Sequence, residues 1–201
     1  MHLYTTSASP NGQRVNVFIK EKGLDVPLTE VDIMGGENLG DEFTARNPFG
    51  RVPVLELDDG RYLSESVSIC RYLEGLSPEP NLFGTDATET AFIDMWLRRV
   101  DINLQMPVAQ AFRNTSGIFK DREVCHEEWG KISMDIARDA AGKFNDHLAS
   151  NEYLMGDRYS AADIMLAITL GFAKRTGQDF FDMEHLKRYN DQVRARPAFA
   201  S

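Results

Sequence analysis

A twenty-residue stretch, 47–66, constrains the fold more than any other part of this sequence. The Val52–Pro53 bond is a candidate cis peptide, because only X–Pro bonds adopt the cis form at low cost. Residues 54–57 are typical of a strand, Asp59-Gly60 is a strong signal for a hairpin turn, and residues 62–63 begin the return strand. Pro53 lacks the N–H that would pair in a sheet. The stretch therefore predicts a β-hairpin that begins beside an exposed backbone edge.

A helix start follows this hairpin directly. Ser64-Glu65-Ser66 opens a segment in which Ile69, Tyr72 and Leu73 have helical spacing. A helix N-terminus presents unpaired N–H groups and a partial positive charge, which suit an anion. An exposed strand edge beside such a terminus is a socket for a small peptide that bears a carboxylate. Considered alone, Ser66 would be an ordinary helix cap, and its position after the Val-Pro hairpin is what favours a binding role.

The first part of the chain alternates strand and helix signals in the order β-α-β-α-β-β-α. Outside the hairpin, strands are predicted over 2–6 and 27–33, and helices are predicted up to Gly23 and over 41–46. A segment rich in Pro and Gly, residues 75–81, is typical of a linker. We therefore expect a first domain over residues 1–76, a linker over 77–86 and a second domain over 87–201.

Strand signals largely stop after the linker, and apolar residues recur at helical spacing. The predicted helices cover 86–114, 122–150, 160–173 and 186–196. Ser160 and Asp163 form a capping box at the start of the most apolar of these helices, because each side chain can satisfy an N–H group of the first turn. We assign Asp163 a structural role rather than a catalytic one.

Composition excludes several classes of function. The chain has 201 residues and a formal net charge of −9, without a run of Lys or Arg, so nucleic acid and anionic membranes are not expected partners. A signal-peptide pattern and an apolar run of membrane length are both absent from the sequence. Two cysteines give no disulfide framework, which fits a cytoplasmic protein. The four histidines lack the spacing of a metal site, so no metal is expected.

Taken together and in this order, the Val-Pro hairpin, the Ser64-Glu65-Ser66 helix start, the linker and the capping box resemble a cytosolic glutathione transferase over essentially the whole chain. The resemblance implies an α/β thioredoxin-like N-terminal domain, an all-α helical C-terminal domain and a homodimer, with glutathione as co-substrate. Ser9-Pro10-Asn11-Gly12 is similar to nu-class bacterial enzymes. Residues 52–60, with Pro107-Val108 and Glu128-Trp129-Gly130, are more similar to the fungal second-type transferases. Both subtypes stay open at this point.

The resemblance places glutathione on the first domain. Glu65 would take the ammonium group of its γ-glutamyl residue, and Ser66 would take the α-carboxylate of that residue. The cysteinyl part would pair with the backbone of Val52 beside Pro53, as extended peptides often pair with a strand edge. Two further residues are candidates for the glycyl end, namely Asn38 and Arg51.

The loop over residues 5–12 should hold the reacting sulfur, because it joins the first strand to the first helix. The thiolate is the nucleophile, and hydrogen-bond donors at a helix N-terminus lower the pKa of the thiol. Ser9 and Asn11 are the first candidates for such donors, followed by Ser7, whereas Tyr4 ranks lower because it lies within the strand. The loop contains no Cys, so the protein cannot form its own mixed disulfide there.

The electrophile pocket is expected on the second domain, with Met106, Gln110 and Arg113 as its candidates. The expected activity is conjugation of the glutathione thiolate to small electrophiles, as in detoxification by transfer of alkyl or aryl groups. Two alternatives stay open. One is a glutathione-dependent disulfide reductase or peroxidase, and the other is a non-enzymatic protein of the same fold that binds a partner or a ligand.

Overall fold

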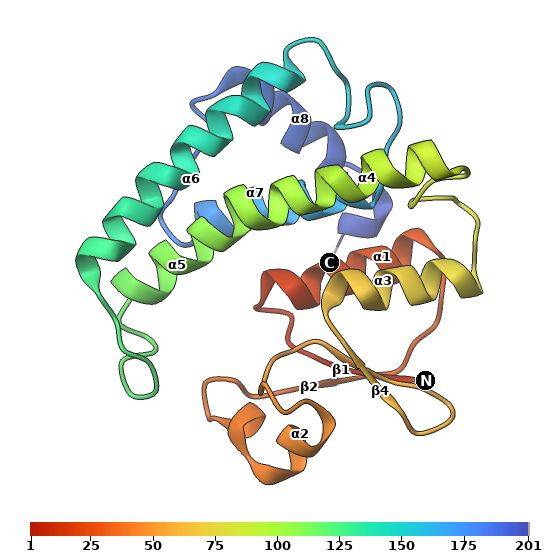
Figure 1. Ribbon diagram of the computed structural model, residues 1–201, viewed down its shortest axis with the longest axis vertical. Helices are drawn as coiled ribbons and strands as arrows, with labels where there is room; N and C mark the ends of the chain where they lie inside the picture. The colour runs from red at the N-terminus through yellow and green to blue at the C-terminus, as the bar shows by residue number, and fades with distance from the viewer. Residues whose placement is uncertain (201) are drawn as a thin grey trace. The chain divides into compact units, whose positions relative to one another are not determined.

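The structure is a computed structural model that describes residues 1–200 and divides them into two compact units (Figure 1). The first unit comprises residues 1–82 together with 197–199, and the second comprises residues 83–196 with Ala200. No strand and no helix is assigned between Leu76 and Ala87. The chain thus returns to its first unit near its end, through a short 3-10 helix, η3 (Pro197–Phe199).

The first unit contains one mixed sheet of four strands. These strands are β1 (His2–Thr5), β2 (Leu28–Glu30), β3 (Val54–Glu56) and β4 (Tyr62–Ser64). Their order is β2-β1-β3-β4, with β2 parallel to β1 and the other neighbours antiparallel. The predicted hairpin is confirmed, and Gly60 supplies the left-handed turn residue with φ of 83°.

Helices cover both faces of this sheet. Helices α1 (Pro10–Glu21) and α3 (Ser66–Leu76) lie on one face, and α2 (Asp41–Arg46) lies on the opposite one, preceded by the 3-10 helix η1 (Glu37–Leu39) (Figure 1). On the α2 face, Phe43 belongs to a buried cluster with Val31, Val52 and Val54. Alternation along the strands turns the fully buried Leu3 to the other face, which α1 and α3 cover. A mixed four-stranded sheet with helices on both faces confirms the predicted thioredoxin-like domain.

The second strand is shorter than its pattern predicted. Residues 27–33 alternate apolar and polar side chains, yet β2 ends at Glu30. Beyond it the backbone bonds to its own loop, because the N–H of Ile33 donates to the carbonyl of Val31 and the N–H of Asp32 donates to Glu37. Local loop bonds therefore end the ladder before the apolar pattern does.

The second unit is helical. Its elements are α4 (Ala87–Val100), the π-helical stretch η2 (Asp101–Gln105), α5 (Met106–Thr115), α6 (Glu127–Leu148), α7 (Ala161–Arg175) and α8 (Glu184–Arg194). Helix α7 is buried throughout residues 161–170 and packs against both α4 and α8. The predicted capping box of Ser160 and Asp163 is confirmed at its start. Within residues 1–200, no helix is both long enough and apolar enough to cross a membrane.

The helix predicted over 86–114 is one rod with an irregular centre. Pro107 lacks an N–H, so a regular helix would leave a carbonyl one turn earlier without its donor. The backbone widens at this point into the π-helical stretch, in which the N–H of Met106 donates to the carbonyl of Asp101. The proline therefore explains why α4 and α5 are separate elements.

Candidate functional site

The loop before α1 is shaped by a glycine and a cap. The hydroxyl of Ser9 accepts a hydrogen bond from the N–H of Gly12 at 2.9 Å, and its oxygen lies 3.3 Å from the carbonyl of Thr6. A Cβ at Gly12 would lie 2.3 Å from that same carbonyl, so no larger residue fits. Ser9 therefore caps the helix, with its hydroxyl oxygen as the acceptor of the capping bond. The hydroxyl proton of Ser9 has only the 3.3 Å contact with the carbonyl of Thr6.

Two other candidates for the sulfur subsite lie beside Ser9. Asn11 is half-buried in the first turn of α1. Ser7 is exposed, its N–H donates to the carboxylate of Glu30 at 3.0 Å, and its carbonyl accepts from Gln13 at 2.8 Å. The backbone of Ser7 is thus held in place, while its side chain faces solvent.

Tyr4 is engaged elsewhere. Its hydroxyl donates to Glu56 at 2.9 Å, and the guanidinium of Arg46 lies 4.4 Å from the centre of its ring. Burial and the bond to Glu56 raise the pKa of this phenol. These contacts agree with the lower rank of Tyr4 among the candidate activators of the thiol.

The backbone edge predicted at Val52 is present. The Val52–Pro53 peptide bond is cis, as predicted, and the side chain of Val52 is buried. Within residues 1–200, neither the N–H nor the carbonyl of Val52 has a hydrogen-bond partner. An extended peptide can pair with this residue as an added strand.

Glu65 has an unusual backbone. It is the residue before α3, and its φ of 69° is the only positive value of a non-glycine among residues 1–200. Such conformations cost about 1–3 kcal/mol and concentrate at functional sites. The carboxylate of Glu65 is exposed and makes no hydrogen bond within the described chain, so it is available to a ligand cation.

Ser66 begins α3 and is buried, with 6% of its surface exposed. No side chain caps this helix, so the first-turn N–H groups of α3 have no side-chain acceptor. The helix end and the hydroxyl of Ser66 together form a site that suits a carboxylate.

Arg14 is a site residue that the sequence analysis missed. It lies on α1 with 3% of its surface exposed, and its Nη1 donates to the hydroxyl oxygen of Ser66 at 2.6 Å. A signal was present in the sequence, because Arg14 lies four residues before the core residue Phe18 and so shares the buried side of the helix.

The two candidates for the glycyl end differ in their surroundings. Asn38 is buried, and its Nδ2 donates to the carbonyl of Gly50 at 2.7 Å, while its Oδ1 is buried without a hydrogen-bond partner. Arg51 is exposed next to Val52. Asn38 thus fixes the loop before the Val-Pro turn, and Arg51 is an exposed residue of this loop.

The three candidates for the electrophile pocket share one face of α5 in the second unit, at spacings of four and three residues. Met106 is exposed, and the Oε1 of Gln110 accepts from Asn114 at 3.2 Å. Arg113 forms a bidentate ion pair with Glu123 and lies 4.4 Å from the centre of the Phe119 ring. The charge of Arg113 is therefore already neutralised by an acidic neighbour.

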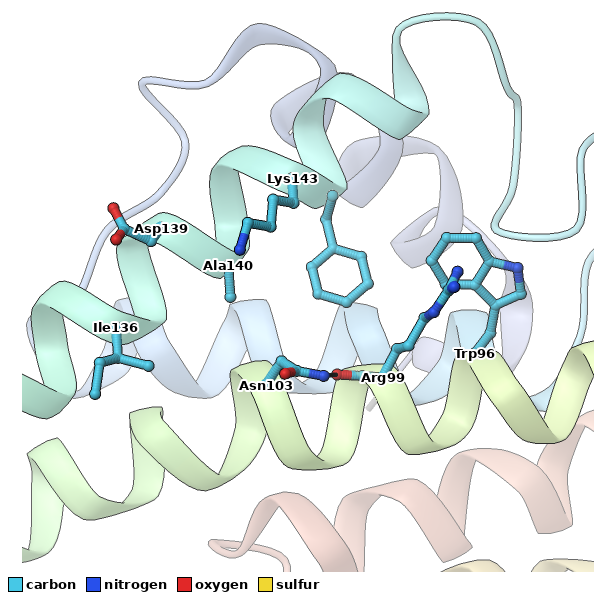
Figure 2. Close-up of a pocket in the computed structure, with 8 residues that line it drawn as sticks. Trp96, Arg99, Asn103, Ile136, Asp139, Ala140 and Lys143 are labelled. Carbon is cyan, nitrogen blue, oxygen red and sulfur yellow. Dashed lines mark hydrogen bonds between the residues drawn. The ribbon is translucent and has the colours of Figure 1, made fainter.

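A cavity of about 470 Å³ lies in the second unit between the α4–η2 rod and α6 (Figure 2). It is lined by Trp96, Arg99, Asn103, Ile136, Asp139, Ala140, Lys143 and Phe144. The guanidinium of Arg99 lies 4.8 Å from the Trp96 ring centre. None of the residues predicted for the electrophile pocket lines this cavity.

The two cysteines are free thiols. Cys70 is buried in α3, and its burial raises the pKa of the thiol to about 12. Cys125 is half-buried, with its sulfur 3.3 Å from the carbonyl of Arg113. Neither thiol lies in the loop where the sulfur of glutathione is expected.

Comparison with known proteins agrees with this fold. The model of the glutathione S-transferase N-terminal domain matches residues 3–81, and the model of the C-terminal domain matches residues 108–199. Glutathione S-transferase 2 of Saccharomyces cerevisiae is 34% identical over 177 residues, which cover 86% of this chain and 76% of that protein. The chain belongs to the glutathione S-transferase family. Of the two subtypes that the sequence left open, these relatives support the fungal second type.

Two further similarities, to a bacterial protein and to an elongation factor subunit, bear on the function. The crystal structure of a glutathione S-transferase domain-containing protein from Marinobacter aquaeolei VT8 is 36% identical, with a TM-score of 0.95 and full coverage of both chains. Elongation factor 1-gamma 2 of Oryza sativa subsp. japonica is 30% identical over 190 residues. Those residues are 93% of this chain but only 44% of that protein, so the chain spans less than half of this relative.

Proposed function

We propose that this protein is an enzyme that conjugates the thiolate of glutathione to small electrophiles. The observation that supports this most directly is the pair Glu65 and Ser66 at the start of α3. Glu65 has a strained backbone and an available carboxylate, and Ser66 stands at an uncapped helix N-terminus. A γ-glutamyl group carries one ammonium and one α-carboxylate, and this pair complements both charges.

The cysteinyl and glycyl residues of glutathione are assigned to residues that precede α3 in the first unit. The cysteinyl residue pairs with the open N–H and carbonyl of Val52 beside Pro53, as an added strand. Arg51 takes the glycyl carboxylate, and Asn38 supports that end by holding Gly50 in place. This assignment gives the charged ends of glutathione and the backbone of its cysteinyl residue partners in the first unit.

The sulfur lies at the N-terminus of α1 in this proposal. The hydroxyl of Ser9 and the first-turn amide of Asn11 donate to the thiolate, and Ser7 is the third candidate. The thiol releases its proton to solvent, the thiolate attacks the electrophilic carbon, and the leaving group departs with the bonding electrons. Donors at the sulfur lower the pKa of the thiol, and each pKa unit corresponds to about 1.4 kcal/mol between the protonation states.

The face of α5 that presents Met106, Gln110 and Arg113 supplies contacts for the electrophile. Because Arg113 is paired with Glu123, we expect this face to favour apolar electrophiles over anionic ones. We also propose a cytoplasmic homodimer that requires no metal and whose partners are small molecules rather than nucleic acid or membranes.

The proposed chemistry is tested at Ser9. Ultraviolet titration of bound glutathione should show a thiol pKa that rises by about one unit in Ser9→Ala, since one donor to the thiolate is lost. The rate of chlorodinitrobenzene conjugation at neutral pH should fall about tenfold, which is the change in thiolate fraction that one pKa unit represents. Ser7→Ala tests the third candidate in the same loop, and we expect it to change both quantities less than Ser9→Ala does. If the pKa of the bound thiol stays unchanged in Ser9→Ala but rises in Ser7→Ala, Ser7 rather than Ser9 is the donor to the thiolate.

A second function is favoured by the elongation factor 1-gamma relatives, because they are not named as transferases. The protein would then bind a partner or a ligand without catalysis. Retention on immobilised glutathione combined with turnover of chlorodinitrobenzene supports the enzyme, whereas absence of both supports the binding protein. Turnover of a glutathione mixed disulfide in place of chlorodinitrobenzene would instead identify a disulfide reductase.

A further inference from the structure

The contact between Arg14 and Ser66 joins the two helices that form the proposed glutathione site. These residues are 52 positions apart, and both side chains are almost completely buried. A guanidinium has donors and no acceptor, so in this 2.6 Å bond the serine oxygen must be the acceptor. The hydroxyl proton of Ser66 is then directed away from Arg14 and is left for a different acceptor.

The positive charge of Arg14 also favours an anion at the start of α3. Its guanidinium is bonded to the first residue of α3, where the helix already carries partial positive charge. The acidic residue further along α3, Glu74, is paired with Lys22. A buried cation at a helix N-terminus strengthens the attraction for an anion there, because the surroundings screen it less than water does.

We propose that Arg14 is the positioning residue for the α-carboxylate of the γ-glutamyl group. It holds the Ser66 hydroxyl in the orientation that donates to this carboxylate and adds positive charge behind it. Arg14 acts through Ser66 and does not touch the reacting sulfur. The inference rests on the proposed function, since it deepens the binding site assigned to glutathione.

A double-mutant cycle on glutathione affinity tests this inference. Calorimetry should show that Arg14→Met weakens binding about tenfold or more in the natural chain, since a charge-assisted contact is lost. In the Ser66→Ala background the same substitution should change the dissociation constant by less than about threefold, because the oriented hydroxyl is gone and only the weaker effect of the Arg14 charge remains. Lys20→Met removes a positive charge from the exposed side of the same helix and should leave the affinity unchanged.

A second ligand separates positioning from general support of the fold. The probe is 4-aminobutanoyl-cysteinyl-glycine, which is glutathione without the α-carboxylate of its γ-glutamyl residue. Arg14→Met should change its affinity by less than about threefold. Arg14→Lys keeps the charge and one donor, so it should recover part of the glutathione affinity. A crystal structure of the natural protein with glutathione should show the Ser66 oxygen bonded to both Arg14 and the carboxylate.

The outcomes distinguish this inference from the proposed function. Equal losses for both ligands, or an undiminished Arg14 effect in Ser66→Ala, would overturn the positioning role while glutathione binding itself stands. Direct contact of Arg14 with the carboxylate in the crystal would overturn it as well, and this measurement needs no variant that might misfold. If the natural protein binds no glutathione, the proposed function and this inference fall together.

Discussion

At the scale of single residues, Asp163 shows how a buried charge is held in this fold. Its carboxylate is fully buried and accepts four hydrogen bonds, from the N–H of Leu154, the N–H and hydroxyl of Ser160, and the hydroxyl of Tyr189. Burial raises the pKa of Asp163 to about 6, although these four bonds act in the opposite direction. The Asp163 carboxylate therefore caps α7 and also bonds α7 to α8 through Tyr189.

This raised pKa predicts a pH-dependent stability. The folded protein binds a proton at Asp163 more tightly than the unfolded chain does, so its contribution is fully present below the unfolded pKa of about 3.9 and is lost as pH rises through about 6. Relative to Asp163→Asn, which cannot titrate, the free energy of unfolding should therefore fall by about 2–3 kcal/mol between about pH 4 and pH 7. Urea unfolding of both proteins across this range measures the difference. A constant or rising difference would contradict the assignment.

The control for this prediction is an exposed carboxylate. The ion pair with Arg138 lowers the pKa of Asp182. Comparison with Asp182→Asn should therefore give a dependence of the opposite sign, because stability from a lowered pKa is lost as pH falls.

At the scale of elements, one lysine connects α1 to α3 and to the segment behind it. The side chain of Lys22 is completely buried, and it forms an ion pair with Glu74. Its ammonium also donates to the carbonyls of Pro78 and Pro80. The N–H of Leu82 donates to the same Glu74 at 3.0 Å, so the Lys22–Glu74 pair bonds the backbone of the segment after α3 to both helices.

Lys22→Met should destabilise the protein by about 3–5 kcal/mol, because it leaves a buried carboxylate without its cation. The double variant Lys22→Met with Glu74→Leu should recover most of this loss, since an apolar pair of similar volume removes the unpaired charge. Lys20→Met, on the exposed side of α1, is the control and should stay within about 0.5 kcal/mol. Denaturant unfolding measures all three, and a double variant as unstable as Lys22→Met would refute this account.

At the scale of the whole molecule, one face of α6 carries exposed apolar side chains, where a helix in contact with water is usually polar. Trp129, Ile132 and Ile136 follow one another at helical spacing, and 47%, 44% and 43% of their surfaces are exposed. Ile136 also lines the cavity between α6 and the α4–η2 rod. Contiguous exposed apolar residues of this kind mark interaction surfaces. We expect this face to be the contact between the two copies of the proposed homodimer.

Light scattering should therefore give a mass of about twice 22.7 kDa for the natural chain. Ile132→Glu should shift the population toward the 22.7 kDa monomer, because two copies of the new charge would be buried at a two-fold contact. Ile118→Glu changes an equally apolar exposed side chain in the loop between α5 and α6, outside this helix face, and should leave the mass unchanged. A natural chain that is monomeric at micromolar concentration would reject the dimer proposal.

The candidate site was predictable where its parts are close in sequence. The Val52–Pro53 bond, the hairpin at Asp59-Gly60 and the helix start at Ser66 lie within twenty residues of one another. Turn and cap preferences are local, so the sequence predicted all three, and the structure confirms them. The capping box of Ser160 and Asp163 was predictable for the same reason.

The amino-acid sequence by itself determined the thioredoxin-like and helical halves and the local elements of the proposed glutathione site, because period, turn and cap signals act over a few residues. The tertiary structure alone decided that Arg14 supports Ser66, that Lys22 pairs with Glu74 and that Tyr189 bonds to Asp163. These partners lie 52, 52 and 26 positions apart. A buried polar side chain must find a partner wherever packing places one, and packing depends on the whole fold.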